Sequence, residues 1–211
     1  MAITVLAESN FIFEVVFNQE QAYYCEQIIS LCEQGLIQLV IPAYCFVEPY
    51  EKLTRQEKDR AQLFRQLNIE INQLQRNSRY QSQLHQLETV TQLLANSTTV
   101  DQENFDSLCQ RLLNTVTIIP LSSHILINIP LYRQNPYELS PQDAVVYCSV
   151  LSFLQTDTSS SRYIFLNKNT RDFFIPNIMR ELDAHSCKLF SNFEHGYHHI
   201  TSYLSPFAQE D

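Results

Sequence analysis

Glycine is nearly absent from this chain of 211 residues, which contains only Gly35 and Gly196. A phosphate-binding loop, a GxGxxG dinucleotide turn and a GxSxG nucleophile elbow each need several glycines close together, because the backbone must turn tightly or approach a ligand. The sequence therefore excludes protein kinases, P-loop ATPases, Rossmann dehydrogenases and α/β-hydrolases.

Paired cysteines and long apolar runs are also missing. The six cysteines form no CxxC pair, and several lie within apolar runs such as 43–47 and 145–150. We therefore expect buried free thiols in a reducing compartment, and neither a disulfide framework nor a zinc site. The N-terminus has no basic leader region, and no apolar run approaches the roughly 18 residues of a membrane span. These features predict a soluble cytoplasmic protein that has no membrane partner.

Short apolar runs that alternate with helical patterns are the main structural signal. We expect strands at 3–6, 36–41, 115–119, 163–166 and 187–190. Between the first two strands, apolar residues recur at helical spacing over 22–32, with Asn18 as the expected N-cap and Gly35 just past the end. This alternation predicts an α/β fold with a mostly parallel sheet covered on both faces.

A long stretch, roughly 50–112, separates the second and third predicted strands. Apolar residues recur at spacings of three and four in two runs, 63–74 and 84–94. This period predicts a helical hairpin that is broken near 77–78 and ends at a polar loop, 96–104. We expect a single domain over 1–204 that contains this helical insertion, followed by a polar tail at 205–211.

Acidic residues follow several predicted strands at one edge of the sheet. Glu8 comes directly after the first strand, Glu48 a few residues after the second, and Asp172 in the loop after the fourth. Asp143 opens a helix for which Ser140 is a suitable N-cap. In an open parallel sheet these positions share a crevice, and acids gathered there need a cation; hard oxygen donors suit Mg²⁺ or Mn²⁺. Taken singly, each acid also fits a structural role as a cap, a turn residue or a solvated side chain.

Four segments resemble the motifs of PIN-domain nucleases. They are Glu8-Ser9-Asn10 after the first strand, PAYCFVE at 42–48, SPQDA at 140–144, and FLNKNTRDF at 165–173. The resemblance implies a three-layer α/β/α fold and Mg²⁺- or Mn²⁺-dependent endonucleolytic cleavage of single-stranded RNA. It leaves open a toxin role with a protein antitoxin as partner, and a homodimer.

The resemblance also implies roles for individual residues. The expected metal ligands and catalytic acids are Glu8, Glu48, Asp143 and Asp172. Asn10 is expected to orient the first acid, and Asn167 or Asn169 to lie near the metal-bound water.

Positive charge is concentrated locally on a chain whose net charge is −9. Half of the 14 basic residues fall between 51 and 80, where the local net charge is +3, and a second group surrounds the fourth predicted strand. One interpretation is an ordinary solvated helix face. The other is a track for RNA phosphates, in which Arg55, Arg65, Lys168 and Arg171 bind the RNA backbone.

Two departures from the family pattern support an alternative hypothesis. The first acid is Glu8, whereas the family usually has the shorter Asp, and Mg²⁺ demands near-octahedral geometry. Pro49 directly follows Glu48, and proline disfavours helical geometry at the residue before it. The alternative to an active endoribonuclease is therefore a catalytically impaired PIN-fold module that binds RNA or a protein partner.

Overall fold

The chain forms two compact units. The computed structural model describes residues 3–157 and 162–204, apart from the side chains of 81–83, 85, 86 and 88. Met1–Val47 and Leu108–Asp211 make up one unit, here called the α/β unit, and Glu48–Ser107 make up the other, called the hairpin unit. The predicted polar tail, 205–211, lies outside the described residues.

Five parallel strands form the sheet of the α/β unit. They are β1 (Ile3–Ala7), β2 (Gln38–Pro42), β3 (Thr117–Ile119), β4 (Arg162–Leu166) and β5 (Cys187–Phe190). Their order in the sheet is β3-β2-β1-β4-β5, which makes β1 the central strand between β2 and β4. Every residue of β1 is buried, as expected for a strand that is covered on both faces.

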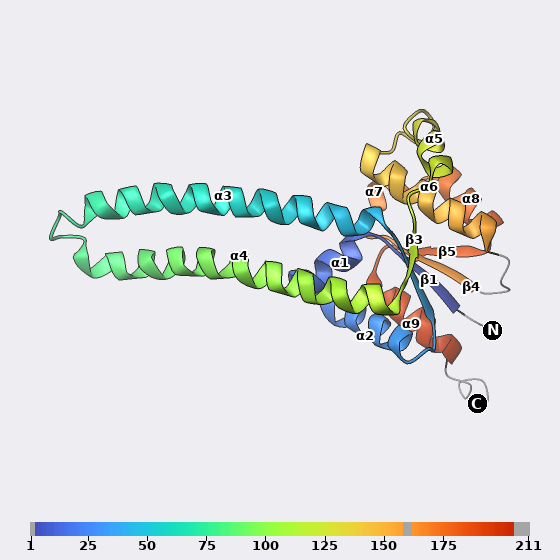
Figure 1. Ribbon diagram of the computed structural model, residues 1–211, viewed down its shortest axis with the longest axis horizontal. Helices are drawn as coiled ribbons and strands as arrows, with labels where there is room; N and C mark the ends of the chain where they lie inside the picture. The colour runs from blue at the N-terminus through green and yellow to red at the C-terminus, as the bar shows by residue number, and fades with distance from the viewer. Residues whose placement is uncertain (1–2, 158–161, 205–211) are drawn as a thin grey trace. The chain divides into compact units, whose positions relative to one another are not determined.

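Helices cover both faces of this sheet, so the predicted three-layer α/β/α fold is confirmed. One layer contains α1 (Ser9–Val16), α2 (Ala22–Glu33) and α9 (Phe193–Leu204), and the other contains α5 (Ser123–Tyr132), α6 (Pro141–Thr156) and α8 (Pro176–Ala184) (Figure 1). A one-turn helix, α7 (Thr170–Phe173), follows β4. The sheet edge at which β1 and β4 end therefore has a helix start close by on either side.

Gly35 ends α2 as predicted. Its φ of 71° is left-handed, and its N–H donates to the carbonyl of Cys32. The N–H of Leu36 donates to the carbonyl of Leu31, which completes a Schellman motif. Because Leu36 takes part in closing the helix, β2 begins at Gln38 and not at the predicted position 36.

The predicted N-cap of α2 is wrong. Asn18 has a left-handed φ of 45°, and Gln21 is the N-cap residue instead. The N–H of Gln21 is held by a carboxylate of the preceding helix, Glu14 Oε2, at 2.7 Å. The start of α2 is thus fixed by a residue of α1 and not by a local capping side chain.

Two long antiparallel helices, α3 (Tyr44–Leu74) and α4 (Gln81–Thr115), provide the hairpin (Figure 1). The predicted break near 77–78 is confirmed, but the predicted polar loop at 96–104 is wrong, because α4 runs through it. Arg60 of α3 donates to Thr98 at 3.3 Å and to Asp101 at 2.8 Å, and these contacts stabilise the polar stretch as a helix. Since α4 continues to Thr115, β3 begins two residues later than predicted.

The cysteines and the apolar content of the helices are two further features of the structure. All six cysteines are free thiols, and five of them are buried. Over the parts of the chain that the structure describes, no helix is long and apolar enough to cross a membrane.

Candidate acidic site at the sheet edge

Glu8 connects the end of β1 to the end of β4. It is the N-cap of α1, where its Oε2 accepts the N–H of Asn10 at 2.9 Å. Its Oε1 accepts the N–H of Lys168, from the loop after β4, at 3.2 Å. β1 and β4 are parallel neighbours with Ala7 opposite Leu166, so both strands end at the same edge. Asn10, which the resemblance expects to orient the first acid, contacts Glu8 through its backbone N–H, and its role in orienting that acid stays a prediction.

Two asparagines shape the loop after β4. Asn167 is buried, and its Oδ1 accepts the N–H of Asn169 at 2.8 Å. Asn169 is the N-cap of α7, and its Oδ1 accepts the N–H of Asp172 at 3.4 Å. These local hydrogen bonds place Asp172 in the first turn of a short helix, which the sequence did not predict.

Asn169 also brings together two aspartates that are far apart in sequence. Its Nδ2 donates to Asp172 Oδ2 at 2.8 Å and to Asp143 Oδ1 at 3.4 Å. Asp143 lies in the first turn of α6, where its N–H donates to Ser140 Oγ at 3.1 Å and its Oδ2 accepts from the same hydroxyl at 2.6 Å. The two interpretations of Asp143 are therefore compatible, because one oxygen serves the helix cap and the other faces the cluster.

The electrostatics of this cluster favour a cation. Burial raises the pKa of Asp143, the nearby charge of Asp172 raises it further, and hydrogen bonds from Ser140 and Asn169 act in the opposite direction. The amide N–H₂ of Asn169 supplies only partial positive charge between the two carboxylates. A divalent cation would neutralise them fully, and carboxylate oxygens are the ligands that Mg²⁺ and Mn²⁺ prefer. The two aspartates thus fit such a cation, although no group of three His, Cys, Asp or Glu able to hold a metal ion is found among residues 3–157 and 162–204.

A second buried acid, Glu14 of α1, binds the side chain of the same lysine whose backbone binds Glu8, and it was not predicted. Only 1% of its side chain is exposed, and its Oε1 lies 2.5 Å from the ammonium of Lys168. The sequence does contain a signal for it, because Glu14 stands alone in the apolar run FIFEVV, where a solvated position is not expected. Lys168, a predicted RNA contact, is therefore engaged with an acid of its own unit, and 37% of its side chain remains exposed.

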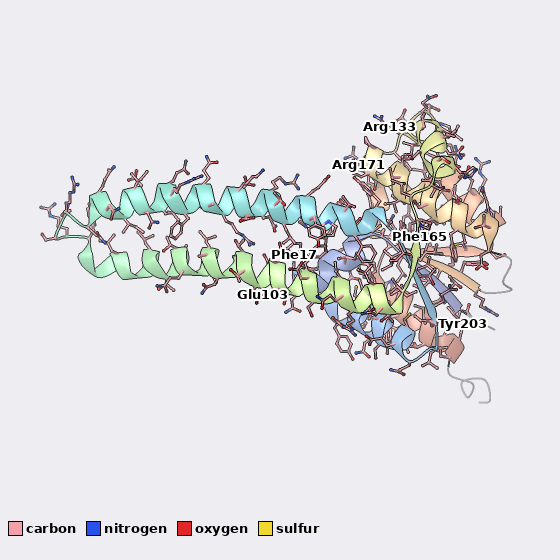
Figure 2. All side chains as sticks on the ribbon, in the orientation of Figure 1. Phe17, Glu103, Arg133, Phe165, Arg171 and Tyr203 are labelled. Atoms are coloured by element: carbon pink, nitrogen blue, oxygen red, sulfur yellow. The ribbon has the colours of Figure 1, made fainter. Side chains whose placement is uncertain are left out.

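The other predicted residues are divided between the two units. Arg171 is exposed on α7, in the α/β unit (Figure 2). Glu48, Arg55 and Arg65 belong to the hairpin unit, where Glu48 is half-buried near the start of α3 and both arginines are exposed. Glu48 is helical although Pro49 follows it within the same helix. Its place as a fourth acid, and the contacts of the two arginines with RNA, stay predictions.

A parallel α/β sheet with acids gathered at the carboxyl ends of its strands defines a class of protein whose chemistry lies at that edge. A comparison with family models matches residues 5–173 to the PIN domain. The chain therefore belongs to the PIN-domain family, whose members are generally nucleases. No curated protein and no solved structure matches the chain.

Proposed function

We propose that this protein is a divalent-metal-dependent endoribonuclease that cleaves single-stranded RNA. The observation that carries the proposal is the convergence of Asp143 and Asp172 on the amide of Asn169. Membership of a family of nucleases supports it. The carboxylate oxygens of the two aspartates are donors of the kind that Mg²⁺ and Mn²⁺ prefer.

Each residue of the site has a distinct part in this proposal. Asp143 and Asp172 hold the cation, and Asn169 keeps the two carboxylates together. When bound, Mg²⁺ or Mn²⁺ activates water and neutralises charge that develops on the phosphate. Glu8 fixes the edge of the site, because it caps α1 and binds the loop after β4. Glu48 remains the proposed fourth acid.

The decisive variant is Asp143→Asn. We expect Mn²⁺-dependent cleavage of a fluorescent single-stranded RNA to fall by about 100-fold or more, since loss of a ligand charge weakens cation binding. Thermal stability should change little, because the N–H of residue 143 still donates to Ser140. Mn²⁺ should raise the melting temperature of the wild-type protein more than that of the variant.

Asp183→Asn is the matched control, since Asp183 is an exposed acid of the same unit. It should leave both cleavage and the Mn²⁺ effect unchanged. Wild-type cleavage that persists in EDTA, or full activity of Asp143→Asn, would contradict the proposal.

A catalytically impaired module is the second candidate function. Three observations favour it. Both oxygens of Glu8 accept backbone N–H groups, and Lys168 is paired with Glu14. Among the described residues, no group of three His, Cys, Asp or Glu able to hold a metal ion is found. A wild-type protein that binds RNA or a protein partner, and cleaves RNA with neither Mg²⁺ nor Mn²⁺, would establish this function. Glu8→Asp tests whether the longer side chain of Glu8 causes the impairment, because this variant would then gain cleavage activity.

A further inference from the structure

A groove opens next to the acidic site, at the end of α1. It has a volume of about 660 Å³ and is lined by Phe17, Asn18, Gln19, Glu20 and Lys168. Lys168 is the residue whose N–H binds Glu8. Lys168 therefore connects the groove to Glu8, which fixes the edge of the site that we propose to act on a phosphodiester.

Phe17 gives the groove an aromatic wall. It is the C-cap residue of α1 and is labelled in Figure 2. Its ring stacks on Phe13 with centroids 5.9 Å apart and planes 26° apart. Phe13 is only 7% exposed, so the ring against which Phe17 stacks is anchored in the core. A fixed and half-buried aromatic ring is the type of surface on which proteins stack unpaired RNA bases.

The other lining residues supply polar groups suited to a nucleotide. Lys168 offers an ammonium with three protons, of which Glu14 accepts one, at 2.5 Å. Asn18 and Gln19 are exposed amides, and each carries a donor and an acceptor that can meet the edge of a base. Glu20 is an acid in the lining and disfavours a phosphate beside it.

We propose that this groove binds one nucleobase of single-stranded RNA, stacked on Phe17, while Lys168 contacts the adjoining phosphate. This subsite rests on the proposed function and adds a base-binding position to it. Among the described residues that line the groove, Lys168 is the one cation. Stacking therefore supplies most of the binding, and that part of the affinity depends little on salt.

The test is RNA binding by the full chain in EDTA, which prevents metal-dependent cleavage. The probes are a fluorescein-labelled 15-nucleotide oligoadenylate and a chain of equal length with abasic spacers. Phe17→Ala should weaken binding of oligoadenylate by about tenfold, with an unchanged dependence of affinity on salt. Phe17→Tyr should bind as the wild type does, and Phe17→Leu, which keeps apolar volume without an aromatic face, should bind like Phe17→Ala. On the abasic chain all four proteins should bind alike.

Tyr203→Ala is the matched control, since Tyr203 is an exposed aromatic residue of the same unit outside the groove lining (Figure 2). It should leave binding unchanged. Equal affinity of Phe17→Ala and wild-type protein for oligoadenylate, or no binding by the wild type, overturns the subsite. The Phe17→Leu comparison holds even if Phe17→Ala unfolds. Failure of the proposed function gives a different result, because Mn²⁺ then produces no cleavage while the effect of Phe17 on binding persists.

Discussion

The α/β unit and the hairpin unit bury their large apolar side chains to different extents. In the α/β unit, Phe11, Phe165 and Phe193 are fully buried between the sheet and its helices. In the hairpin unit, Leu63, Ile69 and Leu93 are exposed, Leu93 by 66%. Two helices bury only the stripes that face each other, whereas three layers enclose a core. The three-layer arrangement can hold catalytic groups in fixed positions, and the two-helix arrangement presents a large surface.

The two units also differ in the charged side chains that they present. The α/β unit gathers acids at one sheet edge, where Asp143 and Asp172 meet Asn169. Exposed cations, Arg55 and Arg65 among them, line α3 of the hairpin unit. We therefore propose that the chemistry belongs to the α/β unit, apart from the proposed contribution of Glu48, and that the hairpin unit contributes binding.

The largest expected effect on stability comes from replacing a buried phenylalanine by alanine, once in each unit. Phe165 is fully buried in the sheet, with its ring 5.8 Å from that of Phe173 (Figure 2). Phe165→Ala should lower the free energy of unfolding of the α/β unit by about 3–5 kcal/mol. Phe105 in α4 is equally buried, but its ring packs against Tyr50, which is itself 50% exposed. Phe105→Ala should cost less, because water can reach the space that the ring leaves.

Urea unfolding followed by circular dichroism, together with hydrogen exchange of individual amides, separates the two units. The effect of Phe105→Ala should be confined to amides of the hairpin unit. If both variants lost the same free energy of unfolding, and if amides of both units exchanged faster, the units would share one cooperative core.

The elements that were predicted correctly are those that local sequence determines. The strands are short apolar runs that alternate with helical patterns along the chain, and Gly35 supplies the left-handed residue that ends α2. The polar stretch 96–104 was predicted to be a loop because its own residues favour one. Its helical partner, Arg60, lies 41 positions before Asp101 in the sequence. A contact between residues so far apart in the sequence produces no periodic pattern in the local sequence.

The candidate site shows the same limit. Strand order and helix starts indicated that Glu8, Asp143 and Asp172 belong at one edge, since parallel strands end together. The pairing of Lys168 with Glu14, 154 positions away, was not predictable from spacing. Nor was the double role of Asn169, which caps α7 and binds both aspartates.

The next effect tests whether the hairpin unit contributes binding. Reversal of Arg55 and Arg65 to Glu should weaken binding of single-stranded RNA by about tenfold or more at low salt, and should make affinity less dependent on salt. Affinity for Mn²⁺ should stay nearly unchanged. The measurements are fluorescence anisotropy over a salt series and calorimetric titration with Mn²⁺.

Reversal of Arg133 and Arg180, two exposed arginines of the α/β unit, makes the same change in net charge and is the control. It should affect RNA binding less. If Arg55 and Arg65 can be reversed without loss of RNA binding at low salt, the basic segment is a solvated face or a protein-contact surface.

The smallest effect concerns an ion pair between the two helices of the hairpin unit. Arg60 and Asp101 lie 2.8 Å apart, with 24% and 15% of their side chains exposed, so solvent screens the pair only in part. A double-mutant cycle with Arg60→Leu and Asp101→Asn should give a coupling energy of about 1 kcal/mol, near the upper end for partly exposed pairs. Asp106→Asn is the control, because Asp106 is an exposed acid of the same helix that accepts a hydrogen bond from Gln102. Hydrogen exchange of amides in α4 should increase for Asp101→Asn and stay unchanged for Asp106→Asn. A coupling energy near zero would mean that α4 remains helical across 96–104 without the Arg60–Asp101 ion pair.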